Sequence, residues 1–130
     1  VLHRQNHNPL QDVQQVITQK QLQEMQEQAA SVYTKKEVID YIIALIGATR
    51  KHGQLLRGAS PRATLSVTAM AKSVAYLSGR DYLLPGDVQT VFVNTVAHRL
   101  LLTPEAENAG ISAQSILEAV LKATPAPKLR

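Results

Sequence analysis

The residue with the clearest potential for chemistry is Arg62, which directly follows Ser60 and Pro61. A serine followed by proline is typical of the cap and first residue of a helix, so Arg62 is predicted in the first helical turn. A cation there opposes the positive end of the helix dipole, at a cost of about 0.3–1 kcal/mol. Because helical side chains lean toward the N-terminus, Arg62 would project past the helix end and, with the unpaired amides, form a site for an anion such as phosphate. A solvated arginine or a surface salt bridge explains the residue equally well on local physics alone.

The rest of the chain contains no complete active site. A phosphate-binding loop needs glycines followed by lysine, and none of the 6 glycines precedes a lysine. No acidic pair follows an apolar strand to hold magnesium, and no Ser, His and Asp set lies on a recognisable elbow. His3 and His7 have the spacing of helical metal ligands, but their segment has no helical period and no further ligands, so we predict no metal site. Hydrolysis by this chain alone is therefore not expected.

The composition indicates one domain with an aliphatic core. The 130 residues are 45% hydrophobic but only 4% aromatic, and the absence of cysteine excludes disulfides and thiolate metal sites. The lack of cysteine also suits a reducing cytoplasm, where we predict the protein to be. No stretch approaches the apolar length that crosses a bilayer, so we expect no membrane partner. The chain begins at Val1 and shows no signal-peptide pattern, so we expect a piece of a longer protein.

Five segments have the apolar spacing of helices, and most have a visible cap or stop. They cover residues 18–31, 34–50, 60–79, 85–99 and 112–125. Thr34 and Glu37 match a capping box for the second segment, whose predicted core face comprises Val38, Ile42, Leu45 and Ile46, joined by Ile39 and Ile43. The predicted stripe of the third comprises Ala63, Val67, Met70, Val74 and Leu77.

These segments predict an all-α fold, a compact helical bundle of about five helices. Only the stretches 32–33 and 100–102 are β-prone, so any strands should be minor. The helical domain should span residues 18–125, preceded by a lead-in segment at 1–17 and followed by a tail at 126–130.

Several stretches resemble the lid of one family of ATPases. Residues 58–63 read Gly-Ala-Ser-Pro-Arg-Ala and look like the GASPRA motif of MoxR-type AAA+ ATPases, in which the arginine is called sensor 2. The family's other lid motifs are matched in order by Asp40-Tyr41-Ile42-Ile43, Ala48-Thr49-Arg50, Gly79-Arg80-Asp81-Tyr82, Pro85-Gly86-Asp87-Val88 and His98-Arg99. The resemblance covers essentially the whole chain, and the ordered set makes it more specific than GASPRA alone.

The resemblance implies a function for the longer protein. A preceding α/β core would bind ATP with magnesium, and this lid would close over the nucleotide, with Arg62 as a catalytic residue that contacts the γ-phosphate beside Ser60 and Pro61. Tyr41 and Leu45 would approach the adenine, although core packing explains both equally well. The implied partners are the core domain, neighbouring subunits of a ring that is commonly hexameric, and a von Willebrand factor A domain protein. Such ATPases resemble chaperones that mature or assemble other proteins.

Two residues depart from the family pattern. Leu84 stands where a Ser or Thr cap is common, and Gly86 stands where an acid is common. The start of the helix at Pro85 should therefore be less firmly capped.

Two other functions compete with a nucleotide-sensing lid. A net charge of +4 and a pI of about 9.6 allow a basic helical nucleic-acid-binding module. Its basic residues are scattered, however, and the predicted helix after Pro85 has none before Arg99, whereas DNA binders usually cluster them on one face. Nucleic acid is therefore not an expected partner. A plain oligomerisation bundle fits the aliphatic stripes but leaves Arg62 unexplained.

Overall fold

A computed structural model describes residues 9–128 of the chain. Its elements follow one another as η2 (Pro9–Asp12), α1 (Gln19–Ser31), α2 (Lys36–Arg50), β1 (Leu55–Arg57), α3 (Pro61–Leu77), α4 (Pro85–Val96), η3 (Ala97–Arg99), β2 (Leu101–Leu102), α5 (Pro104–Asn108) and α6 (Ala113–Ala123), where η denotes a short 3-10 helix. The predicted all-α class with minor strands is confirmed, and α5 is a short helix that the sequence did not predict. None of the helices in this range is long and apolar enough to cross a bilayer.

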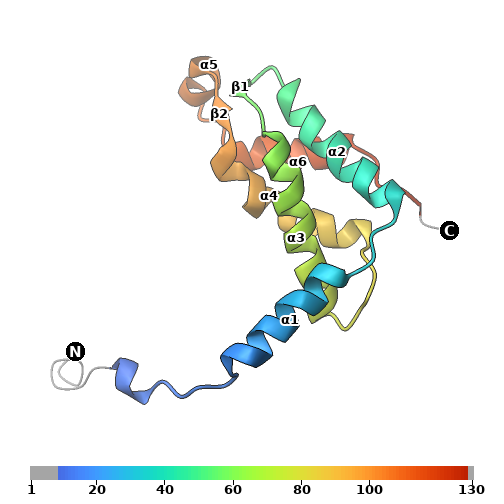
Figure 1. Cartoon of the computed structure of the whole chain (residues 1–130). Helices are drawn as coiled ribbons and strands as arrows, with labels where there is room; N and C mark the ends of the chain where they lie inside the picture. Colours follow the sequence, from blue (N-terminus) through green and yellow to red (C-terminus); the bar gives the residue numbers. More distant parts are fainter. Residues whose placement is uncertain (1–8, 129–130) are drawn as a thin grey trace.

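Helix α3 is the centre of the arrangement. Helices α1, α2 and α4 all pack against it, and α6 packs against α2 and α4 (Figure 1). The core is aliphatic as predicted, with Phe92 of α4 as its largest fully buried side chain. Of the face predicted for residues 34–50, the four main members are at most 1% exposed: Val38, Ile42, Leu45 and Ile46.

The buried stripes are narrower than the predicted ones. Ile39 and Ile43 of α2 are 38% and 53% exposed, and Met70 and Leu77 of α3 are 50% and 76% exposed. The residues of α3 that are fully buried recur every fourth position and are small: Ala63, Val67, Ala71 and Ala75. Small residues at this spacing let neighbouring helices approach closely, so the larger apolar residues are left on the flanks.

Helix α1 lies at one end of α3 and contributes no residue to the fully buried core (Figure 1). Its predicted cap is confirmed, because the Thr18 hydroxyl accepts a hydrogen bond from the Gln21 amide at 3.1 Å. Two side chains of α3 fasten it. Tyr76 donates its hydroxyl to the Gln28 side chain at 2.8 Å, and the Lys72 ammonium donates to the Ala30 carbonyl at 2.8 Å.

The capping box predicted at Thr34 and Glu37 is wrong. Helix α2 begins at Lys36, and the Thr34 hydroxyl is buried without a hydrogen-bond partner. The reason is that Tyr33 is held extended by neighbouring backbone: its amide donates to the Asp81 carbonyl at 2.8 Å, and its carbonyl accepts from the Leu83 amide at 2.9 Å. The resulting isolated β-bridge, between Tyr33 and Tyr82, is the only β-structure that the β-prone stretch 32–33 forms among the described residues.

The start of α4 is held more firmly than its sequence suggests. Leu84 makes no side-chain capping bond, as expected, but the Asp87 carboxylate accepts a hydrogen bond from the Leu84 amide at 2.9 Å. The same carboxylate forms a two-pronged ion pair with Arg80, at 2.8 and 2.6 Å. The prediction of a weakly capped helix is therefore corrected by an acid three residues into the helix.

A small sheet lies beside the start of α3. Strands β1 and β2 pair in antiparallel fashion, with Leu55 opposite Leu102 and Arg57 opposite Leu101. Only β2 falls in a stretch that the sequence marked as β-prone. Because β1 ends at Arg57, the sheet anchors the chain immediately before the Gly58 to Arg62 segment.

Candidate functional site

The structure places Arg62 in the first turn of α3, as predicted. Ser60 is the N-cap residue and Pro61 the first helical residue, but the Ser60 side chain makes no capping hydrogen bond. The Arg62 side chain is exposed and forms no hydrogen bond or ion pair with any described residue. The surface salt bridge that competed with an anion site is therefore not formed within residues 9–128.

The backbone just before Arg62 is bound to the end of α2. Thr49 is fully buried, and its hydroxyl donates to the Ile46 carbonyl at 2.7 Å and accepts from the Ala59 amide at 2.9 Å. The Arg50 Nε donates to the Ala59 carbonyl at 2.7 Å. Both backbone groups of Ala59 are thus satisfied by consecutive residues of α2.

A depression of about 520 Å³ lies between α2 and the start of α3. Its lining combines two arginines with apolar and small residues: Ile43, Ile46, Gly47, Arg50, Pro61, Arg62, Thr64 and Leu65. Ile43 and Leu65 are 53% and 73% exposed, so the apolar wall is open to a ligand or to another domain. Two guanidinium groups beside an apolar wall suit a polyanion that also carries an apolar part.

Pro61, also a predicted site residue, lines this depression beside Arg62, whereas Ser60, Tyr41 and Leu45 do not line it. Ser60 adjoins Arg62, but Leu45 is 0% exposed and Tyr41 is 4% exposed, and both belong to the core. The Tyr41 hydroxyl accepts a hydrogen bond from the Gln89 side chain at 3.2 Å. Core packing, the alternative explanation for both residues, therefore matches their positions, and their contact with adenine stays a prediction.

Sequence reasoning missed Arg50 and Ile43 as site residues. Ile43 was assigned to the core face, and Arg50 was noted only within Ala48-Thr49-Arg50. Within residues 9–128 no three His, Asp or Glu side chains gather as a metal site, while His3 and His7 lie outside the described residues. The cationic character of the site therefore comes from the two arginines.

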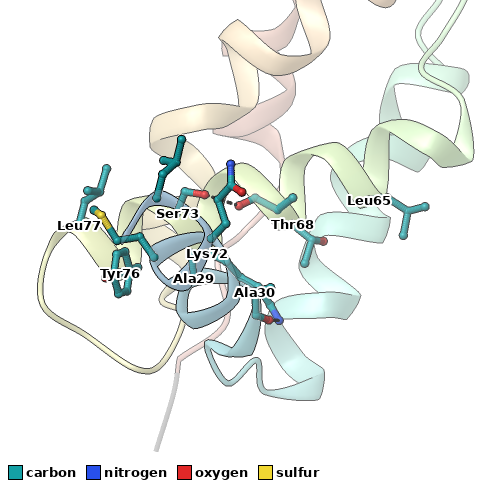
Figure 2. A pocket seen from close by; sticks show the side chains of 12 residues that line it. Ala29, Ala30, Leu65, Thr68, Lys72, Ser73, Tyr76 and Leu77 are labelled. Carbon is teal, nitrogen blue, oxygen red and sulfur yellow. Dashed lines mark hydrogen bonds between the residues drawn. The ribbon is translucent and has the colours of Figure 1, made fainter. Parts of the chain in front are cut away.

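A separate apolar groove runs between α1 and α3. Figure 2 shows side chains from both helices around it, and Leu65 at one end also lines the depression beside Arg62. Lys72 is the one charged residue among those that line it, and its ammonium is bound to the Ala30 carbonyl. The groove offers an apolar contact surface without catalytic groups.

Comparison with known proteins identifies the family. The AAA lid domain family matches residues 47–120, more than half of the chain. The chain is also 34% identical over 138 residues to Chaperone MoxR1 of Mycobacterium tuberculosis, in a match that covers 99% of this chain and 36% of that protein. The chain is the lid domain of a MoxR-family AAA+ ATPase. The lid is likewise 40% identical over 72 residues to Protein MoxR of Methylorubrum extorquens, covering 54% of the lid and 21% of that protein.

Two further relatives also match nearly the whole lid. Uncharacterized protein YeaC of Bacillus subtilis is 30% identical over 123 residues, which are 95% of the lid and 38% of that protein. A crystal structure from Cytophaga hutchinsonii superimposes with a TM-score of 0.87 at 31% identity, covering 98% of the lid and 41% of that chain. The lid spans less than two fifths of the length of the curated relatives YeaC and MoxR1.

Proposed function

We propose that the lid senses the nucleotide bound by the core domain of its parent ATPase, and that Arg62 is the sensing residue. The observation that carries the proposal is an exposed guanidinium in the first turn of α3 that pairs with no side chain among residues 9–128, within the GASPRA stretch of a lid of this family. A cation at the positive end of a helix is locally unfavourable, so an anionic partner from outside the lid would compensate it.

The guanidinium suits contact with the γ-phosphate. Its planar fork can donate two parallel hydrogen bonds to phosphate oxygens. Charge on those oxygens shifts during phosphoryl transfer, and a donor held in place stabilises the shifted charge without reorganising. Magnesium bound with ATP by the core would neutralise part of the same charge. Arg62 would thereby link lid position to nucleotide state.

The family also supports a proposal for the wider role of the parent protein. We propose a cytoplasmic ATPase that acts as a ring oligomer, in which lid movement drives chaperone-like maturation or assembly of other proteins, with a von Willebrand factor A domain protein as partner. The support is the membership of the MoxR family and the similarity to a protein named as a chaperone. The lid by itself should not hydrolyse ATP.

The test replaces Arg62 in the full-length ATPase. We expect Arg62→Ala to lower kcat by about 10²–10³-fold, the usual effect of losing one preorganised donor to transition-state charge. Arg62→Lys should recover activity only in part, because lysine retains the charge but not the two-pronged geometry. Lys122→Ala is the charge-matched control, since Lys122 is an exposed cation in the last turn of α6.

Thermal stability without nucleotide should hardly change in Arg62→Ala, because removing a cation from the positive end of α3 is neutral or slightly favourable. Wild-type turnover of Arg62→Ala would refute the assignment. A large loss of stability without nucleotide would indicate that Arg62 has a structural partner in the parent protein.

A further inference from the structure

The segment that carries Arg62 is clamped onto the end of α2. Ala59 is 1% exposed, and its amide and carbonyl are bound by the Thr49 hydroxyl at 2.9 Å and the Arg50 Nε at 2.7 Å. The Thr49 hydroxyl is itself oriented by the Ile46 carbonyl, so the acceptor that meets the Ala59 amide has one favoured direction. The Thr49–Ala59 hydrogen bond is buried and resists opening, because the freed groups would have no water to bind.

Gly58 shows how closely the two chain segments approach. A Cβ atom at this position would lie 2.6 Å from the Arg50 Cα, the Arg50 nitrogen and the Thr49 carbonyl carbon. These are backbone atoms within a helix, so they cannot move aside as a flexible side chain could. Any residue with a side chain at Gly58 would push the segment away from α2.

These contacts of Gly58 and Ala59 with Thr49 and Arg50, here called the clamp, are supported by the sheet, which holds the chain just before Gly58. Strand β1 ends at Arg57, whose partner in β2 is Leu101, so the chain enters Gly58 from a fixed position. It leaves through Pro61, whose ring limits the backbone to one φ value. Arg62 is therefore the first residue after a stretch that is held on both sides.

We propose that Thr49 and Arg50 are positioning residues for Arg62, and that the clamp makes the end of α2 and the sensing arginine one rigid unit. The inference rests on the proposed function of Arg62. Its consequence is that, when the lid rotates, Arg62 moves as far as the end of α2 does, because the segment between them is held rigid. Arg50 acts on ATP turnover through Arg62 and not by its own contact with the nucleotide, although both side chains line the same depression.

A double-mutant cycle in the full-length ATPase tests this mechanism. Arg50→Ala should lower kcat by about 10- to 100-fold, as expected when a catalytic group is misplaced by about 1 Å, with KM for ATP little changed. In the Arg62→Ala background the same Arg50→Ala substitution should have almost no further effect on kcat, because the residue that it positions is gone. Lys122→Ala, which removes an exposed cation of α6, serves as the charge-matched control in both backgrounds.

Four further variants keep both arginines. Gly58→Ala should lower kcat as Arg50→Ala does, because the added methyl group displaces the segment from α2. Gly53→Ala is the control, since a Cβ at Gly53 meets no atom within 4 Å. Thr49→Val should lower kcat, whereas Thr49→Ser, which retains the hydroxyl, should preserve most of it. These variants also cover the case in which Arg50→Ala fails to fold.

The outcomes separate this proposal from the proposed function. If Arg62→Ala lowers kcat but Arg50→Ala is as harmful with Arg62 absent as with it present, Arg50 acts independently and the positioning role is wrong. Normal turnover of both Gly58→Ala and Thr49→Val would also overturn it while leaving Arg62 as the sensor. Normal turnover of Arg62→Ala would overturn both. Non-additive losses together with an active Gly53→Ala support the clamp.

Discussion

The ion pair between Arg80 and Asp87 gives a sharp prediction about the stability of the lid. The Asp87 side chain is only 7% exposed and accepts three hydrogen bonds, two from the Arg80 guanidinium and one from the Leu84 amide. Asp87→Asn keeps the shape of the side chain but removes its charge and replaces one acceptor oxygen with a donor group. The variant would leave the Arg80 cation, whose side chain is 22% exposed, without a counter-charge.

The size of the effect follows from this burial. Removing one partner of a buried ion pair costs about 3–5 kcal/mol, mostly because the remaining charge is left uncompensated. Since Arg80 can still turn partly toward water, we expect a loss of about 3 kcal/mol in the free energy of unfolding at pH 7. That loss is a large share of the 5–15 kcal/mol that is typical of a domain.

The dependence of lid stability on pH should also change in Asp87→Asn. Burial alone would raise the pKa of the Asp87 carboxyl, but the hydrogen bonds from Arg80 and the Leu84 amide and the charge of Arg80 outweigh burial and hold the pKa below its ordinary value. The folded lid therefore keeps this carboxylate ionised at pH values where the unfolded chain protonates it. The stabilisation is present above the unfolded pKa of about 3.9 and is lost as the pH falls through the folded pKa.

Urea unfolding of the lid, followed by far-ultraviolet circular dichroism from pH 7 to acid, measures both effects. Asp81→Asn is the matched control, because Asp81 is an exposed aspartate in the same connector. It should stay within about 0.5 kcal/mol of the wild type. An Asp87→Asn variant as stable as the Asp81→Asn control, or one with the same loss of stability in acid as the wild type, would refute the reasoning.

Two further predictions concern the core and the isolated lid. Leu45→Ala should lower the free energy of unfolding in urea by about 2–5 kcal/mol, because Leu45 is fully buried. Ile43→Ala, at a 53% exposed residue of the same helix, should cost far less. Equal losses would show that the assigned core face is wrong. The isolated lid should show no ATPase activity, because it has no phosphate-binding loop. It should also show no tight duplex DNA binding in a gel shift at physiological salt, because a dispersed net charge of +4 gives few simultaneous phosphate contacts. Tight, salt-sensitive binding would favour the nucleic-acid-binding alternative.

Local sequence signals were enough to locate most of the helices. Thr18 and Ser112 cap their helices through their side chains, and Pro61 and Pro85 are first helical residues, as predicted. Each signal acts within one turn of chain, so it operates before any tertiary contact exists. The position of Arg62 in the first turn of α3 followed from the same signals.

The sequence predictions that were wrong concern residues whose local preference is overridden by contacts with distant segments of the chain. The capping box at Thr34 was lost because the backbone of Tyr33 is bound to Asp81 and Leu83, nearly fifty residues along the chain. The helical period of α3 allowed Met70 and Leu77 in the core, but packing against three helices left only a narrow line of small residues inside. Hydrophobic spacing identifies an apolar face, while its width is decided by how closely the neighbouring helices approach.

The same distinction between local signals and long-range contacts applies to the candidate site. The sequence by itself determined that an arginine starts a helix in a chain without a phosphate-binding loop, and its motifs indicated the family. Only the tertiary structure decided that Ile43 is exposed and that Arg50 lines the same depression as Arg62. The Arg50 to Ala59 bond joins residues nine positions apart through a turn, a strand and a close backbone approach at Gly58. No periodicity records such a contact, because it forms only when two elements with independent local preferences are brought together by packing.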